Sequence, residues 1–135
     1  EATKIARTAL RIIEDNRMTK LRFSEVKTMV EVVRQMLRTS LDSFARMDVS
    51  KTVEIAKKDE LVDEQYRSTI RQLVTFMLED PRTISMSLEV MFVAKAIERI
   101  GDHAKNISEY IVYTVKGKDI RHASIKEIQK TIKTL

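Results

Sequence analysis

One apolar repeat constrains this chain more than any other feature of its sequence. Apolar or small residues recur at steps of three and four, without a break, from Met86 to Val115. This spacing follows one face of an α-helix, and Gly117 behind it is a residue that commonly ends helices. The sequence therefore predicts a long helix that ends near Gly117. The members of the repeat are Met86, Val90, Val93, Ile97, Ile100, Ala104, Ile107, Ile111 and Val115.

A second helix is predicted from about Thr19 to Met47 by the same kind of spacing. Asp48 and Ser50 follow it and offer either a short break or a cap for the next helix. We expect its buried face to comprise Phe23, Val26, Val30, Val33, Leu37, Ser40, Phe44 and Met47.

A third pattern predicts a helix that lies between these two and ends near Glu79. Pro81 marks its end, because proline disfavours helical geometry in Asp80 before it and fits the first turn of a new helix. The apolar arc of this helix contains Ile55, Val62, Tyr66, Ile70, Leu73 and Met77.

Three long helices with short connections predict an all-α fold, an antiparallel three-helix bundle over about residues 17–117. The composition supports this prediction, because the 135 residues include only 2 Gly and 1 Pro, and 43% of them are hydrophobic. Residues 1–16 have a helical pattern but no residue that would start a helix. Part of their sequence is similar to the segment that begins at Ala104. We therefore interpret them as the end of the last helix of a preceding repeat. Residues 118–135 read as a basic C-terminal tail or a short amphipathic helix.

Composition also narrows the class of protein. The chain has no Cys, which leaves no disulfide framework and fits a reducing compartment, so we expect a cytoplasmic protein. No apolar run approaches the roughly 18 to 20 residues that cross a bilayer. The net charge of +5 is spread over every segment and aromatic residues make up only 5%. We therefore expect no nucleic-acid binding, while a helical DNA-binding or transcription-regulator fragment stays open as an alternative.

Two acidic pairs are the candidate functional residues. Asp59 with Asp63, and Glu98 with Asp102, are each spaced four residues apart, which places both carboxylates of a pair on one helix face. Like charges in this position repel, and a bound cation would turn repulsion into attraction. Asp59 also falls inside an apolar arc, where a carboxylate needs a partner. In a chain with 20 acidic residues such pairs also arise by chance.

The two pairs are predicted to meet. If the helices run antiparallel from a bend at Pro81, Asp63 and Glu98 lie at matched depth along the bundle. Four carboxylates, with Asn106 as a possible further ligand, would suit Fe, Mn, Mg or Ca, and Zn is also possible. His103 lies about 140° around the helix from Glu98 and is not expected to join them.

Catalysis finds little support in the sequence. The chain has no Gly-rich phosphate loop, no cysteine nucleophile and no His-Glu pattern of the ferritin type. We therefore expect no enzyme, and keep a ferritin-like di-metal enzyme only as an alternative to be tested by metal-dependent oxidase activity.

Three segments carry a resemblance to a known family. Residues 96–109, AIERIGDHAKNISE, strongly resemble the third helix of a PhoU repeat; residues 57–63, KKDELVD, resemble the acidic stretch of its second helix. Residues 116–122, KGKDIRH, resemble the C-terminal segment of the family. Since PhoU proteins consist of two similar three-helix bundles, the resemblance implies that this chain is the C-terminal repeat, preceded by the end of the first.

The resemblance also implies a function and a site. Family members carry acidic motifs associated with metal clusters, and the matching positions here are Asp59, Asp63, Glu98 and Asp102. The implied role is negative regulation of phosphate uptake and phosphate-starvation signalling, through contact with the ATPase of the phosphate ABC transporter and a phosphate-sensing histidine kinase. The resemblance further implies a homodimer for the full-length protein, which would reach the membrane only through these partners.

Overall fold

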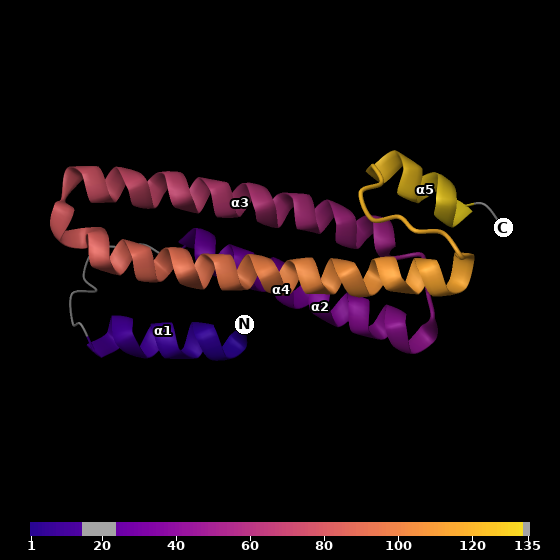
Figure 1. Ribbon diagram of the computed structural model, residues 1–135, viewed down its shortest axis with the longest axis horizontal. Helices are drawn as coiled ribbons and strands as arrows, with labels where there is room; N and C mark the ends of the chain where they lie inside the picture. The colour runs from indigo at the N-terminus through magenta and orange to yellow at the C-terminus, as the bar shows by residue number, and fades with distance from the viewer. Residues whose placement is uncertain (15–23, 134–135) are drawn as a thin grey trace.

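The computed structural model describes residues 1–14 and 24–133, which form an elongated helical bundle (Figure 1). Three long helices make the bundle, a shorter helix lies along the first half of α4, and the last helix lies near the start of α3. Within the described residues the elements are α1 (Ala2–Glu14), α2 (Ser24–Arg46), α3 (Thr52–Glu79), a 3-10 turn η1 (Pro81–Thr83), α4 (Ile84–Lys116) and α5 (Ile125–Lys133). The predicted all-α bundle is confirmed.

The ends of α3 and α4 lie where the sequence places them. Asp80 leaves the helical conformation with φ −141°, and its side chain accepts a hydrogen bond from the Arg82 backbone N–H at 3.1 Å. Pro81 then opens the next turn. Gly117 ends α4 in the left-handed conformation with φ 65°, which glycine adopts at little cost. Both boundary predictions are confirmed.

The main core lies between α2, α3 and α4. The three helices come together at Gly101, where an added Cβ atom would make ordinary contacts, 3.4 Å from Val33 Cγ2 and 3.8 Å from Val62 Cγ1. The buried cluster consists of Met29, Val33, Met36, Ile55, Val62, Ile97 and Ala104.

The predicted buried face of α2 is wrong in part. Val30, Phe44 and Met47 are exposed, whereas the residues buried along this helix are Met29, Val33, Met36, Ser40 and Ser43. The buried face is therefore rotated by about one residue at both ends of the helix. Val33 and Ser40 are buried as predicted; near the end of α2 the small Ser43 faces the bundle, and a search for apolar spacing prefers Phe44 beside it. Phe23 and the predicted start at Thr19 lie outside the described residues.

The two flanking segments both form helices. Thr8 of α1 is buried, and Arg11 forms an ion pair with Glu89 of α4 at 2.8 Å. At the other end, Ser124 and Glu127 form a capping box that starts α5, with the Ser124 N–H donating to Glu127 Oε2 at 2.7 Å. Residues 125–133 thus form a short helix in this structure. Leu135 lies outside the described residues.

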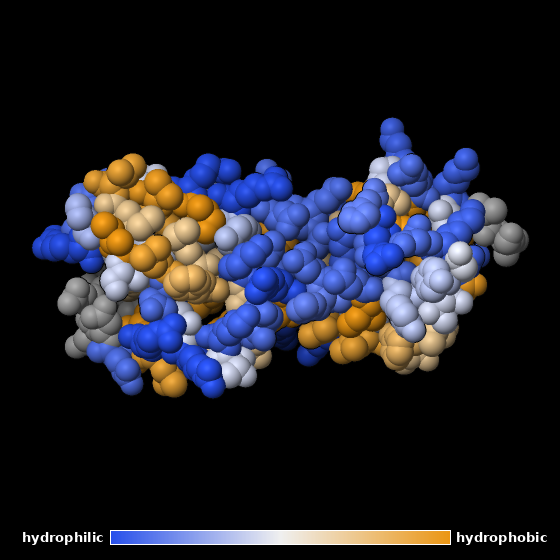
Figure 2. All heavy atoms as spheres, viewed as in Figure 1, coloured by the Kyte–Doolittle hydropathy of each residue, from blue (hydrophilic) through white to orange (hydrophobic). Residues whose placement is uncertain are grey.

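The surface of the bundle is divided by polarity. On the face shown in Figure 2, apolar side chains gather where α3 meets α4, and the middle of the bundle is hydrophilic. The exposed large apolar residues in the last turns of α3 and the first turns of α4 are Val74, Leu78, Ile84, Leu88 and Phe92. No helix in the described part of the chain is both long and apolar enough to span a bilayer.

Candidate metal site

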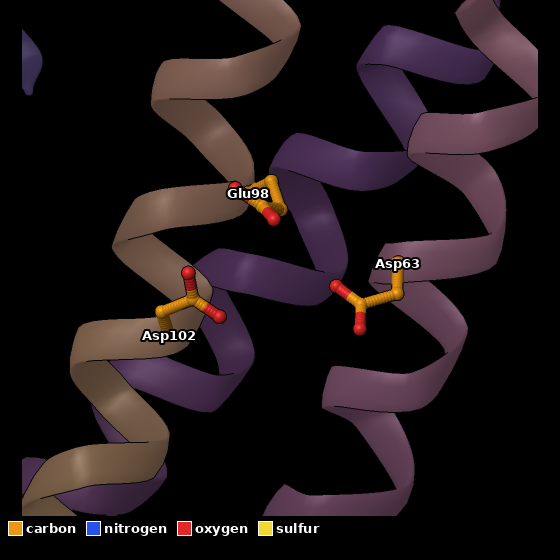
Figure 3. A group of neighbouring side chains, drawn as sticks. All are labelled: Asp63, Glu98 and Asp102. Atoms are coloured by element: carbon orange, nitrogen blue, oxygen red, sulfur yellow. The ribbon is translucent and has the colours of Figure 1, made fainter.

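Three of the predicted carboxylates converge between α3 and α4. Asp63 comes from α3, and Glu98 and Asp102 come from successive turns of α4; all three point toward one another in front of α2 (Figure 3). One oxygen from each lies within 4.8 Å of the others. Among residues 1–14 and 24–133, this is the only group of three or more acidic or histidine side chains that comes so close. The antiparallel course of the helices from the Pro81 turn brings these residues to the same depth.

Glu98 is the most buried member of the acidic triad Asp63, Glu98 and Asp102. Lys95, one turn earlier on α4, donates a hydrogen bond to Glu98 Oε1 at 2.8 Å and lies 2.7 Å from Oε2. The contact with the buried Oε2 is an ion pair, so Lys95 faces both oxygens of this carboxylate. The Lys95 ammonium also lies 5.2 Å from the centre of the Tyr66 ring, which fixes its position further. The charge of Glu98 is therefore compensated in part by Lys95, whereas Asp63 and Asp102 have no ion pair among the described residues.

The electrostatics of the triad favour a bound positive charge. Burial raises the pKa of Asp63, and the nearby Asp59 and Glu98 carboxylates raise it further. Burial likewise raises the pKa of Asp102, with the charge of Glu98 as the next cause. Both shifts have the sign expected for acids that are desolvated beside other acids. A cation at the centre of the triad would offset the repulsion between these carboxylates and so lower both pKa values.

Asp59 does not join the triad. Its side chain is buried, as its position in the apolar arc predicts, but it accepts a hydrogen bond from Lys105 Nζ at 2.8 Å. Although partial burial opposes the shift, this hydrogen bond raises the pKa of Lys105. Asp59 is close enough to raise the pKa of Asp63 and Asp102, so it lies beside the triad rather than in it. Its buried charge is compensated by an ammonium group.

The remaining candidates lie apart from the triad. His103 is exposed, as expected from its position around the helix. Asn106 is also exposed and lines a separate hollow near the C-terminal end of α4. The sequence reasoning missed Lys95 and Lys105. Lys95 could have been found from its i, i+3 spacing to Glu98, whereas Lys105 is 46 residues from Asp59 and carries no such signal.

The donor set fits a hard metal ion. Oxygen ligands bind Mg²⁺ and Ca²⁺ at about 2.0 to 2.6 Å, so two oxygens of one ion lie no more than about 5.2 Å apart. The separation within the triad meets this limit. Three carboxylates without sulfur or imidazole suit Mg, Mn, Ca or Fe, and water would complete the coordination. To bind Glu98, such an ion would share this carboxylate with Lys95 or displace the lysine.

The fold and the site together define a class: an antiparallel helical bundle with a carboxylate cluster between its two longest helices. Residues 26–111 match the family model described as the PhoU domain, and this match covers more than half of the chain. The chain therefore belongs to the PhoU family. The resemblance seen in the sequence is confirmed.

Several relatives support this assignment. The chain is 44% identical over 128 residues to the phosphate-specific transport system accessory protein PhoU homolog of Pseudomonas putida, covering 95% of this chain and 50% of that protein. It is 43% identical over 131 residues to the phosphate-specific transport system accessory protein PhoU of Escherichia coli, covering 97% and 54%. The chain spans about half the length of these relatives.

A solved structure agrees with the fold. The crystal structure of PhoU from Pseudomonas aeruginosa superposes with a TM-score of 0.81 at 39% sequence identity. The superposition covers 87% of this chain and 56% of that one.

Proposed function

We propose that this chain is part of a non-enzymatic regulator of phosphate uptake and phosphate-starvation signalling, and that it binds a metal ion through its acidic triad. The observation that carries the proposal is the convergence of Asp63, Glu98 and Asp102 in a member of the PhoU family. The relatives named accessory proteins of the phosphate-specific transport system support the phosphate-related part.

The metal ion would have a structural role. Asp63 belongs to α3, while Glu98 and Asp102 belong to α4, so an ion bound to all three would hold the two helices together. Of the four predicted ligands, Asp59 stays a prediction, because it would first have to exchange its hydrogen bond with Lys105 for the ion. Asn106 also stays a prediction. The chemistry of the donors leaves Fe, Mn, Mg, Ca and Zn as candidates.

The proposed partners are those that the family resemblance implies: the ATPase of the phosphate ABC transporter and a phosphate-sensing histidine kinase, with a homodimer for the full-length protein. A regulator of this kind works by binding, and its metal ion would set the geometry of the surface offered to the partner. Cytoplasmic location follows from the proposed partners.

A binding measurement tests the proposed function. The purified chain is titrated onto the transporter ATPase and onto the cytoplasmic part of the kinase, with Mn²⁺ or with EDTA. We expect saturable binding to at least one partner that weakens in EDTA and in the Asp63→Asn/Asp102→Asn variant. Glu60→Gln, at an exposed site on α3, is the matched control and should bind as the unaltered chain does. Absence of binding to both partners in the presence of metal would refute the regulatory role.

The two alternative functions are tested in the same preparation. Membership of the PhoU family favours regulation over both of them. Duplex DNA binding would weaken by roughly one log unit per log unit of salt for each phosphate contacted. Iron-dependent oxidase turnover that is lost in the triad variant would indicate the ferritin-like enzyme instead.

A further inference from the structure

A polar hollow lies at the end of α4 that is far from the Pro81 turn. Four of its residues form a stripe on α4, and two come from the segment between α4 and α5, which turns back toward the start of α3 (Figure 1). The hollow has a volume of about 590 Å³. Its lining consists of Asn106, Glu109, Tyr110, Tyr113, Asp119 and Arg121.

The wall opposite α4 is held in place by its own interactions. Asp119 Oδ1 accepts hydrogen bonds from the Arg121 backbone N–H and from Arg121 Nε, each at 3.0 Å. Ile120 between them is buried in a cluster with Val112 of α4 and Ile128 of α5. The bonds from Arg121 lower the pKa of Asp119 to about 2, so Asp119 is ionised and already paired. The hollow is thus formed before any ligand arrives.

Glu109 is the anomalous residue of this hollow. It is only 8% exposed, and no hydrogen bond or ion pair joins its carboxylate to any residue in the described ranges. Lys105, one turn earlier, is the nearest candidate partner, but its ammonium donates to Asp59. Burial raises the pKa of Glu109, and the charge of Lys105 opposes this shift in part. The carboxylate oxygens of Glu109 are not among the fully buried unsatisfied atoms, so they are open to the hollow, where a cationic group could pair with them.

The other lining residues indicate which kind of cation fits. Glu109, Asp119 and Arg121 sum to one net negative charge when all are ionised (two acids, one base). Tyr110 and Tyr113 are 61% and 57% exposed, which leaves their rings open to contact. Aromatic faces attract ammonium and guanidinium groups, and the Asn106 amide oxygen can accept a further N–H.

We propose that this hollow binds a guanidinium group, with Glu109 as its counter-ion and the two tyrosine rings as stacking surfaces. A guanidinium group is planar, carries five N–H donors, pairs with a carboxylate through two bonds and stacks on aromatic rings. The lining of the hollow contains a carboxylate, an amide oxygen and two aromatic rings that could contact such a group. The group could come from an arginine side chain of a partner protein or from a free arginine-like metabolite, and the experiment below separates these two sources.

A metal ion fits this hollow less well than it fits the triad. Asp119 is already occupied by Arg121, which leaves Glu109 as the single free carboxylate. Hard metal ions in proteins usually bind several oxygen ligands. The described residues contain no second group of three close acidic or histidine side chains.

Calorimetric titration of the 135-residue chain in EDTA tests the inference without interference from the metal site. The probes are Nα-acetyl-arginine methylamide, its neutral citrulline counterpart and a short peptide with one arginine. We expect both arginine probes to bind and the citrulline probe to bind about tenfold more weakly or not at all. A peptide that binds better than the amide indicates a protein partner, and equal affinities indicate a small metabolite.

Two variants link the binding to the hollow. Glu109→Gln keeps the shape of the side chain and removes its charge, so arginine affinity should fall about tenfold or more, whereas Glu60→Gln should leave it unchanged. Tyr113→Leu, at an exposed position, should weaken binding without unfolding the chain and serves if Glu109→Gln folds poorly. The inference is overturned if arginine probes do not bind at millimolar concentration, if citrulline binds equally well, or if neither variant changes the affinity.

Discussion

At the scale of single residues, the partner of each buried acid determines what that acid can do. Asp59 and Lys105 compensate one another at 2.8 Å, so Asp59 needs no other ligand in the folded chain. Among the described residues Asp63 and Asp102 have no such partner, and they lie beside Glu98, which is paired with Lys95. The same residue type therefore contributes an internal ion pair in one case and a candidate ligand in the other.

The first prediction concerns the pH dependence of the metal-free chain. Because the folded-state pKa values of Asp63 and Asp102 are raised, ionising them destabilises the fold. The cost is complete above these raised values and disappears below the unfolded value of about 3.9. Asp63→Asn/Asp102→Asn should therefore be more stable than the unaltered chain at pH 7 in EDTA. Urea denaturation at several pH values should show this advantage shrinking as the pH falls; a constant or growing advantage would contradict the prediction.

The second prediction concerns the pair of Asp59 and Lys105. Lys105→Met leaves the buried Asp59 carboxylate unpaired, and we expect a loss of about 2 to 3 kcal/mol, because the lysine is partly exposed and the pair partly screened. Lys105→Met/Asp59→Asn should recover most of this loss, which a double-mutant cycle by urea denaturation measures. If the single and double variants are equally unstable, the ion pair does not stabilise the fold.

At the scale of elements, α4 carries the features on which both proposals rest. The apolar face of α4 packs into the bundle, and its polar face presents the triad in the middle and the hollow near its end. Its length, its glycine end and the proline before it were all predictable, since each is set by local chemistry. The buried face of α2 was predictable only in part: Val33 and Ser40 are buried as predicted, whereas Ser43 was missed because it is buried by the fit between helices rather than by its own hydrophobicity.

Close approach of the helices leads to a third prediction at Gly101. Gly101→Ala should be neutral or stabilise the chain by up to about 1 kcal/mol, because alanine favours the helix and its Cβ would make ordinary contacts with Val33 and Val62. Gly101→Leu should destabilise by about 1 to 3 kcal/mol through overpacking. Denaturation midpoints of the two variants test this; a strong loss with alanine would mean that the helices approach more closely than described.

A fourth prediction concerns the attachment of α5. Ile128 is buried against Val112 and Ile120, so Ile128→Ala should lower the local stability of residues 125–133 by about 2 to 4 kcal/mol. Amide hydrogen exchange should accelerate in this helix and stay unchanged in the main core. Lys126→Ala, at an exposed position of the same helix, is the control. Equal exchange in both variants would show that α5 is not held by this contact.

At the scale of the whole molecule, the candidate site was predictable in part. Helical spacing and matched depth were enough to bring Asp63, Glu98 and Asp102 together, because these follow from helix geometry and one turn. The diversion of Asp59 to Lys105 depends on side-chain conformations across two helices. The hollow around Glu109 depends on the course of residues 117–124, for which the sequence pattern offered only a tail or a helix.

The central claim, a single cation held between α3 and α4 by the acidic triad, is tested most directly by calorimetric titration of the metal-stripped chain. With Mn²⁺ we expect one ion per chain, and at a hundredfold excess over its dissociation constant about 2.7 kcal/mol of added stability, which is several degrees in melting temperature. Asp63→Asn/Asp102→Asn should abolish both effects. If Fe, Mn, Zn, Mg and Ca all leave the melting temperature unmoved at millimolar concentration, or if the variant binds equally well, the triad is not a metal site.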